Sequence, residues 1–218
     1  MYNKRNISII GGAGHVGFGL GLILSSKGFK VSLIDKHRAN IKKINSGQVP
    51  FLEENSEKLL NKMIRRKRIY ATNELNEVLK SKYIIVCIGT PINNKLNPSL
   101  THFINFFYEL KKFLNKNQII IIRSSIYPGI CNKIYKIISS KCKNLSYCPE
   151  RIVQGKLILE LPKLPQLVSG KSKTAILESS KLFKKVCKKI IHTKVIEAEL
   201  VKLFSNAYRY INFSISNQ

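Results

Sequence analysis

The fold is constrained most by the stretch from Ile7 to Asp35, which reads ISIIGGAGHVGFGLGLILSSKGFKVSLID. The β-branched residues of Ile7–Ile10 suit a buried parallel strand. Apolar residues between Val16 and Leu24 predict a helix, and Lys30–Ile34 predicts a second strand. We therefore expect a strand, a tight glycine turn, a helix and another strand that ends at Asp35.

The glycines of this stretch have the G-x-G-x-x-G spacing of dinucleotide-binding turns. Gly12 permits the tight turn, Gly14 lets the backbone approach a pyrophosphate, and Gly17 lets the helix pack close to the sheet. The N–H groups at the start of the helix then meet the phosphates. Asp35 stands where an acid accepts hydrogen bonds from the adenosine ribose, which favours NAD over NADP. The predicted NAD site comprises Gly12, Gly14, His15, Val16, Gly17 and Asp35.

The same stretch has a second interpretation, because the basic start Met1–Asn6 followed by apolar residues is also typical of a signal peptide or membrane anchor. Six glycines and His15 interrupt the apolar run before Lys27, and no small-residue cleavage site follows it. A spanning helix needs a longer unbroken apolar run. We therefore expect a glycine turn here and no membrane segment.

Length and cysteine content limit the class of protein. The 218 residues, 44% of them hydrophobic, suffice for one good-sized domain and part of another. The five cysteines are odd in number and show no C-x-x-C spacing, which argues against a disulfide framework or a metal site and fits a reducing cytoplasm. They are Cys87, Cys131, Cys142, Cys148 and Cys187.

The net charge of +26 favours anionic partners such as nucleic acid, acidic lipid or phosphorylated small molecules. The lysines are scattered along the chain, and Lys62–Arg68 (KMIRRKR) is the one dense cluster. Solvated helix faces and a bias toward Lys, Ile and Asn explain this charge at least as well as a nucleic-acid site. A nucleic-acid binder stays an alternative, and binding that falls steeply with salt and ignores NAD distinguishes it.

Strands alternate with helices along the rest of the chain, which predicts an α/β fold with a parallel sheet covered on both faces. Further strands are expected at Ile69–Ala71, Tyr83–Ile88, Gln118–Ile122, Leu145–Tyr147, Gln166–Val168 and Ile190–His192. Helices are expected around Ile41 and Ile44, at Glu53–Arg66, from an Asn73 cap to Leu79, at Leu100–Leu114, Gly129–Ser140 and Thr174–Val186, and from Glu197 onward.

Ligands of such sheets lie beyond the carboxyl ends of the strands. The chemically distinctive residues fall at those ends, so small hydroxyls and one carboxylate are expected to converge on one rim, as in an enzyme. They are the glycine turn, Asp35, Thr90-Pro91, Ser124-Ser125 and Tyr147-Cys148-Pro149-Glu150.

Six ordered motifs resemble the N-terminal part of the UDP-glucose/GDP-mannose dehydrogenase family. They are GGAGHVG, INSGQVPFLE, CIGTP at 87–91, RSSIYPG at 123–129, YCPER at 147–151 and EAELVKLFSNAYR at 197–209. YCPERIVQG, followed by LILEL and LVSG, is most similar to the UDP-N-acetylmannosamine dehydrogenase branch. The resemblance covers essentially the whole chain and implies a Rossmann-type doubly wound parallel sheet followed by the start of a central dimerisation helix.

Enzymes of this family oxidise a sugar C6 alcohol to a carboxylate with two NAD, through a thioester on a cysteine. The resemblance implies that Thr90, Pro91 and Ser125 line the nicotinamide and substrate region, although many relatives have threonine in place of Ser125. It makes Glu150 the acid that handles water during thioester hydrolysis, a role that needs proton exchange near neutral pH. The alternative for Glu150 is a simple ion pair with Arg151.

Lys202 and Asn206 stand four residues apart, which puts them on one helix face. The resemblance implies that they stabilise the developing oxyanion, where preorganised donors contribute most. An ordinary solvated face is the alternative. Arg151 and Arg209 are expected to contact the substrate or a neighbouring subunit.

Two departures from the family pattern matter. Gln154-Gly155 stands where many relatives have a glutamate before the glycine, a hint about the substrate. No cysteine here has the glycine-rich context of the family nucleophile, and without a thiolate no covalent intermediate forms. We expect an NAD-binding domain at 1–195 and, at 196–218, the truncated start of a central helical domain, so these residues alone are expected to be inactive.

The sequence therefore predicts an NAD-dependent UDP-sugar 6-dehydrogenase, acting on UDP-N-acetylmannosamine and dimerising through the last helix. Another β-hydroxyacid-type dehydrogenase stays an alternative, since that superfamily also uses a lysine–asparagine pair. So does a non-catalytic NAD-binding module. The apolar residues of the last helix suggest a surface that packs on a partner or on its own domain; they are Leu200, Leu203, Phe204, Ala207 and Ile211.

Overall fold

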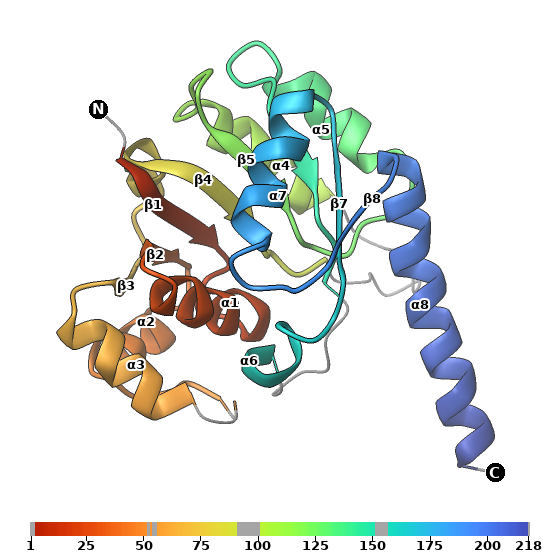
Figure 1. Ribbon diagram of the computed structural model, residues 1–218. Coiled ribbons are helices and arrows are strands. Elements are labelled where there is room, and N and C mark those ends of the chain that lie inside the picture. Colours follow the sequence, from red (N-terminus) through yellow and green to blue (C-terminus); the bar gives the residue numbers. More distant parts are fainter. Residues whose placement is uncertain (1–2, 52, 54–55, 91–100, 151–156, 218) are drawn as a thin grey trace.

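The structure is a computed structural model that describes residues 3–51, 53, 56–90, 101–150 and 157–217. Its strands form one sheet in the order β3-β2-β1-β4-β5-β6-β7-β8 (Figure 1). The doubly wound α/β fold predicted from the sequence is confirmed. The strands are β1 (Asn3–Ile10), β2 (Lys30–Ile34), β3 (Ile69–Thr72), β4 (Ser81–Val86), β5 (Ile119–Ile122), β6 (Leu145–Tyr147), β7 (Gln166–Gly170) and β8 (Ile190–His192).

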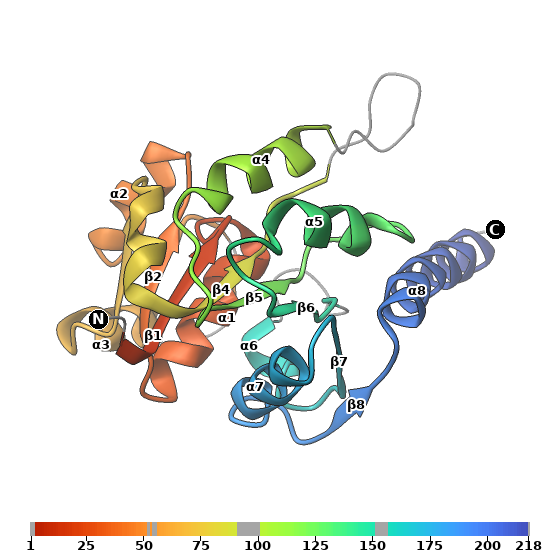
Figure 2. The same ribbon diagram turned by 90° about the horizontal axis from the view of Figure 1, so that it is seen from above.

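Helices cover both faces of this sheet, with α4 and α5 on one side and α1, α6 and α7 on the other (Figure 2). The helical elements are α1 (His15–Ser26), α2 (Arg38–Asn45), α3 (Ser56–Arg65), the 3-10 helix η1 (Leu75–Lys80), α4 (Thr101–Lys111), α5 (Ile130–Ile138), α6 (Leu157–Glu160), α7 (Lys173–Phe183) and α8 (Val195–Ser216).

The alternation of side chains along each strand creates two hydrophobic cores. In β5, Ile119 and Ile121 pack into the core with α1 and α7, whereas Ile120 and Ile122 pack into the core with α4 and α5. All four isoleucines are at most 1% exposed. A strand that is apolar on both faces is typical of the centre of a doubly covered sheet.

The last two strands, β7 and β8, run against the other six, which the sequence analysis did not anticipate. β7 pairs antiparallel with β6 through Ser146–Gly170 and Tyr147–Ser169, while the other strand pairs are parallel. An antiparallel β7 begins at the edge where β6 ends, so Gln166 lies at the carboxyl edge of the sheet. Alternating elements favour a parallel crossover but do not fix the direction of each strand.

Local differences from the predicted elements have simple physical causes. The helix expected after Asn73 is the 3-10 helix η1, whose N-cap is Glu74 and not Asn73. β4 ends at Val86 instead of Ile88, and Cys87 leaves the strand while its N–H still donates to the Ile10 carbonyl at 2.8 Å. Helix and strand ends are set by such individual hydrogen bonds, which periodicity does not encode.

The long helix α8 begins at Val195 and extends away from the sheet (Figure 1). Its start is closed by Glu197, whose carboxylate accepts a hydrogen bond of 2.8 Å from the Lys194 N–H. Ala198, Glu199 and Lys202 are its buried residues, so the described part of the domain covers mainly the first turns of the helix. Within the described ranges no helix combines the length and apolar character needed to cross a bilayer.

Candidate functional site

Two glycines of the β1–α1 turn are required by the packing of the protein itself. A Cβ added at Gly12 would lie 2.6 Å from the Ile9 carbonyl oxygen and 2.7 Å from Leu33 Cα. One added at Gly17 would lie 2.3 Å from the carbonyl oxygen of Gly11. Contacts this short do not occur in proteins, so α1 reaches β1 and β2 only because these residues lack side chains.

Gly14 is different, because among the described residues a Cβ at this position would meet only the Gly11 carbonyl oxygen, at 3.4 Å. Gly14 is the N-cap of α1, where no side chain caps the helix and no acidic residue occupies the first turn. Internal packing therefore does not require a glycine at this position. Its bare backbone and the uncapped N–H groups of α1 leave a surface that suits a closely approaching anion.

Gly11 also shapes this turn, although the sequence analysis did not use it. Its φ of +74° lies in the left-handed region, and an added Cβ would lie 2.7 Å from the carbonyl oxygen of Cys87. Its N–H donates to the Ile34 carbonyl at 2.9 Å, which ties the turn to the end of β2. The signal in the sequence is the doublet Gly11-Gly12 directly after the first strand.

Asp35 lies beside the glycine turn, at the carboxyl end of β2. Its Oδ2 accepts a hydrogen bond of 3.0 Å from the Ala13 N–H, and its Oδ1 accepts one of 3.1 Å from the His37 N–H. Asn40 completes this corner by donating from Nδ2 to the Ala13 carbonyl at 3.3 Å. A carboxylate has about four acceptor positions, so this fixed group can still accept from ribose hydroxyls.

His15 is the first residue of α1, and its ring lies 3.9 Å from the centre of the Phe51 ring. The Nδ1 atom is buried and has no hydrogen-bond partner among the described residues. Burial lowers the pKa of His15, so its imidazole is neutral at neutral pH. Val16 follows it and packs against the core. Both residues therefore lie at the turn, as the motif predicts.

The loops after β4 and β5 meet at the same rim. The hydroxyl of Thr90 donates a hydrogen bond of 2.7 Å to the Ser125 carbonyl, and the Ser125 side chain is exposed. The structure thus brings together two of the residues expected to line the nicotinamide region. Pro91 and Arg151, which were also expected at the site, lie outside the described residues.

Glu150 follows β6 and is buried, and its Oε2 forms an ion pair with Nη2 of Arg123. Arg123 follows β5, and its side chain is completely buried. Its Nη1 donates to Gln166 Oε1 at 2.8 Å, and the guanidinium lies 5.0 Å from the centre of the Phe183 ring. Burial opposes the charge of Arg123, but the neighbouring Glu150 carboxylate raises the pKa of its guanidinium.

The role of Arg123 was missed in the sequence analysis, where Arg151 was the partner considered for Glu150. The sequence does contain an indication of a buried ion pair, because Arg123 directly follows the four isoleucines of β5. A cation that continues a fully buried strand needs a buried acid, because an unpaired charge in that position is very costly.

Lys202, Asn206 and Arg209 share the face of α8 that is turned toward the domain. Lys202 is buried, and the other two are half-buried. The burial of Lys202 contradicts an ordinary solvated face at this position. Because α8 packs against β6 and β7, this face starts near the strand that leads to Glu150.

Glu199 is a further buried acid on α8, to which the sequence analysis assigned no role of its own. It is 1% exposed. Its Oε2 accepts a hydrogen bond of 2.9 Å from the Gly129 N–H, and its Oε1 accepts one of 2.9 Å from the Cys131 N–H. These two N–H groups lie at the start of α5, so one carboxylate joins α8 to α5.

The five cysteines are free, and four of them are buried while Cys87 is half-buried. Burial raises the pKa of Cys87 and Cys148 to about 12 and that of Cys187 to about 11, so their thiols are protonated at neutral pH. Protonated buried thiols are poor nucleophiles. In the part of the chain that is described, no three His, Cys, Asp or Glu side chains are grouped so as to hold a metal ion.

The two ends of the site are separated by the width of the sheet. Asp35 follows β2, whereas Ser125 follows β5, and the order β2-β1-β4-β5 puts three strand spacings between them. At about 4.8 Å per spacing this is roughly 14 Å. The glycine turn after β1 lies between these ends, which suits an extended ligand with a phosphate near its middle.

Comparisons with known proteins match this geometry. The model of the UDP-glucose/GDP-mannose dehydrogenase family, NAD binding domain, matches residues 5–191. A UDP-N-acetyl-D-mannosamine dehydrogenase from Pyrococcus horikoshii is 25% identical over 215 residues, which are 95% of this chain and 51% of that protein. A UDP-glucose 6-dehydrogenase from Rickettsia bellii is 25% identical, covering 98% of this chain and 50% of the relative.

The fold agrees with that of a solved UDP-D-ManNAc dehydrogenase from Pyrococcus horikoshii, with a TM-score of 0.90 at 25% identity. That match covers 97% of this chain and 52% of the other. The chain spans about half the length of the curated relatives it matches. The family resemblance drawn from the six motifs is thereby confirmed.

Proposed function

Because the chain belongs to the UDP-glucose/GDP-mannose dehydrogenase family and carries its NAD-binding domain, we propose that it serves the NAD-dependent oxidation of a UDP-sugar at C6. UDP-N-acetylmannosamine is the proposed sugar, since similar proteins from Pyrococcus and Methanococcus carry that name. The observation that supports the proposal is the N-terminus of α1 at Gly14, which has no side-chain cap and where an added Cβ would make one ordinary contact, at 3.4 Å, with the described residues.

NAD would accept the hydride that leaves the sugar, and the residues around the glycine turn would hold it. The uncapped N–H groups of α1 would bind the pyrophosphate over Gly14, beside His15 and Val16. The carboxylate of Asp35, fixed by its two backbone hydrogen bonds, would accept from the adenosine ribose hydroxyls. Gly12 and Gly17 would act indirectly, by letting α1 approach the sheet.

The nicotinamide end would lie over Thr90, Pro91 and Ser125. The hydrogen bond from Thr90 to the Ser125 carbonyl holds the loops after β4 and β5 at a fixed separation. A fixed separation matters because hydride transfer needs the reacting carbons in close, aligned contact.

Glu150 would handle the water that hydrolyses the thioester, which would form on a cysteine that is not among the five described above. The ion pair with Arg123 holds this carboxylate in one orientation. An oriented carboxylate can accept a hydrogen bond from water and direct it at a carbonyl carbon. In this proposal Arg123 orients the carboxylate and does not touch the substrate.

Lys202 and Asn206 would donate hydrogen bonds to the oxyanion that forms during the reaction. Arg209, one turn further on the same face of α8, and Arg151 would contact the substrate. We assign these residues of α8 to the start of a central domain, 196–218, that follows an NAD-binding domain, 1–195.

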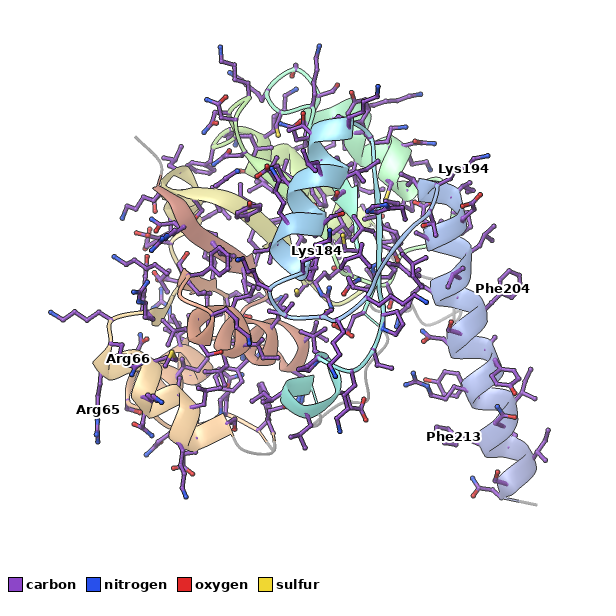
Figure 3. All side chains as sticks on the ribbon, viewed as in Figure 1. Arg65, Arg66, Lys184, Lys194, Phe204 and Phe213 are labelled. Atoms are coloured by element: carbon purple, nitrogen blue, oxygen red, sulfur yellow. The ribbon has the colours of Figure 1, made fainter. Side chains whose placement is uncertain are left out.

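The opposite face of α8 is the proposed dimer surface. Phe204 projects from α8 away from the sheet (Figure 3) and is 68% exposed. Leu200 and Ile211 share its face at helical spacing and are 38% and 57% exposed. Exposed apolar residues gathered on one helix face are rare on monomers and common at interfaces between copies.

Calorimetric titration tests the cofactor part of this proposal. The folded 218-residue chain should bind NAD more tightly than NADP, because Asp35 repels a 2′-phosphate. Absence of binding at millimolar NAD contradicts the proposal.

The reaction itself is tested on the complete protein that is translated from the open reading frame containing these residues. NADH formation is followed with UDP-N-acetylmannosamine, with UDP-glucose and without sugar. The proposal requires NADH formation that depends on a UDP-sugar. A protein that binds NAD but oxidises neither sugar is instead a non-catalytic NAD-binding module.

A further inference from the structure

Helix α8 is attached to the domain over a short stretch. Its buried residues are Ala198, Glu199 and Lys202, and most of the residues beyond them are exposed. Ala198 and the partly buried Val195 pack into the core that contains α4 and α5. The apolar contact of two small residues is non-directional, so it does not determine how a helix of this length is oriented.

Glu199 supplies the directional contact. Both oxygens of its carboxylate accept hydrogen bonds of 2.9 Å, one from the Gly129 N–H and one from the Cys131 N–H. Gly129 is the N-cap of α5, has a φ of 91° and provides no side-chain cap. Glu199 therefore does for α5 what a capping residue ordinarily does, although it lies 70 residues away in sequence. Its charge is also favourable at the positive end of the α5 dipole.

The contact joins two parts of the proposed site. Gly129 ends the RSSIYPG loop, which begins at the buried Arg123 and carries Ser125 on the nicotinamide side. On α8, Lys202 lies three residues after Glu199, one turn along the same face, and Asn206 lies one turn further. A single buried carboxylate thus links the loop that carries Ser125 to the helix that carries Lys202.

We propose that Glu199 is a positioning residue, which holds α8 on the N-terminal end of α5 and so places Lys202 and Asn206 at the carboxyl edge of the sheet. The catalytic meaning of that placement rests on the proposed function, whereas the anchoring of α8 does not. Displacement of a donor by about 1 Å is enough to cost a reaction most of its rate.

The test compares Glu199→Gln with Glu197→Gln in the full 218-residue chain. Both variants exchange one carboxylate for an amide on the same helix. Glu197 is exposed and caps its own helix, a role in which glutamine serves nearly as well. At Glu199 the amide keeps one acceptor and turns an NH₂ group toward a backbone N–H, so one of the two bonds to α5 is lost.

Two readouts report the position of α8 directly. Hydrogen exchange, resolved by peptide, should become about tenfold faster in 195–209 and in 125–135 of Glu199→Gln. The rate of acetylation of the buried Lys202 amine should rise by a similar factor. The strands β1, β2 and β4 and the affinity for NAD should stay unchanged, and Glu197→Gln should match the wild type.

Three results overturn the proposal. These are unchanged exchange in 195–209 of Glu199→Gln, an equal increase in every element including the central strands, and fast exchange of the Gly129 and Cys131 amides in the wild type. If Glu199→Gln does not fold, Glu199→Asp, which keeps the charge on a shorter side chain, is judged by the same criteria.

Steady-state kinetics of the complete protein separate this proposal from the proposed function. Glu199→Gln should lower kcat about tenfold or more and leave the KM for NAD unchanged. If the wild type oxidises no UDP-sugar, the proposed function fails while the exchange data still decide whether Glu199 anchors α8. If the wild type is active and Glu199→Gln keeps its kcat, the positioning role fails alone.

Discussion

At Asp35 a carboxylate fixed by two backbone N–H groups stands directly before three exposed basic residues, Lys36, His37 and Arg38. The acid accepts from a ribose 2′-hydroxyl and repels a 2′-phosphate, whereas neighbouring cations attract that phosphate. The preference between the two dinucleotides therefore depends on one side chain in an otherwise basic surrounding.

Replacing this acid should reverse the preference. Asp35→Ala should weaken NAD binding by about tenfold, or about 1.4 kcal/mol, and should strengthen NADP binding. Calorimetric titration with both dinucleotides measures the two changes, and Arg38→Ala in the same background should remove the gain for NADP. Unchanged selectivity in Asp35→Ala would show that the ribose lies elsewhere.

The buried pair of Arg123 and Glu150 gives a prediction for stability. Arg123→Met leaves the Glu150 carboxylate buried without its cation, which should cost about 3–5 kcal/mol of unfolding free energy. The double variant Arg123→Met with Glu150→Gln removes both charges and should recover much of that loss. Urea unfolding measures both values. A loss below about 1 kcal/mol in the single variant contradicts the buried pair.

The site residues that the sequence revealed belong to local patterns. Asp35 and the glycines were recognisable because their roles depend on neighbours within one turn or strand. Arg123 and Glu199 were not assigned their roles, because their partners lie 27 and 70 residues away. A linear pattern indicates that a buried charge needs a partner but does not identify it.

At the scale of elements, periodicity predicted most strands and helices because apolar runs directly determine burial. It did not predict the direction of β7 or the 3-10 helix after Asn73. Those depend on which edge a connection reaches and on single backbone hydrogen bonds. The antiparallel β7 has a consequence for the site, since it brings Gln166 to the carboxyl edge, where it accepts from Arg123.

Helix α7 is held on β4 by the carboxylate of Glu178, which accepts hydrogen bonds from Lys82, from Lys181 at 3.1 Å and from the Tyr83 hydroxyl at 3.0 Å. Burial opposes ionisation of Glu178, but these donors lower its pKa to about 2. Its pKa in the unfolded chain is near 4.5, so the unfolded state takes up a proton first as the pH falls.

The contribution of Glu178 to stability is therefore complete above about pH 4.5 and is lost as the pH falls toward 2. Glu178→Gln should be less stable than the wild type at neutral pH, and the difference should shrink at low pH. Urea unfolding at a series of pH values measures it. A difference that is the same at every pH would contradict this assignment.

On the scale of the whole molecule, the charge of +26 is spread over solvated helix faces. Arg65 at the end of α3 and Arg66 directly after it point outward (Figure 3). Arg66 lies beside Ser25, Ser26 and Gly28, at the opposite end of α1 from the glycine turn. The exposed aromatic residues gather instead on α8. The molecule therefore has three separate surfaces, each formed by a different part of the chain. They are the rim with the glycine turn, the basic surface at the end of α3 and the apolar surface of α8.

The central claim is that the N-terminus of α1 is kept open for NAD, and Gly14 tests it most directly. Gly14→Ala, Gly17→Ala and the wild type are compared by NAD titration together with urea unfolding. Gly14→Ala should keep its stability to within about 1 kcal/mol and lose about tenfold or more in NAD affinity. Gly17→Ala should lose about 1–3 kcal/mol of stability, because its Cβ overlaps the Gly11 carbonyl. Wild-type NAD affinity in a folded Gly14→Ala would contradict the account.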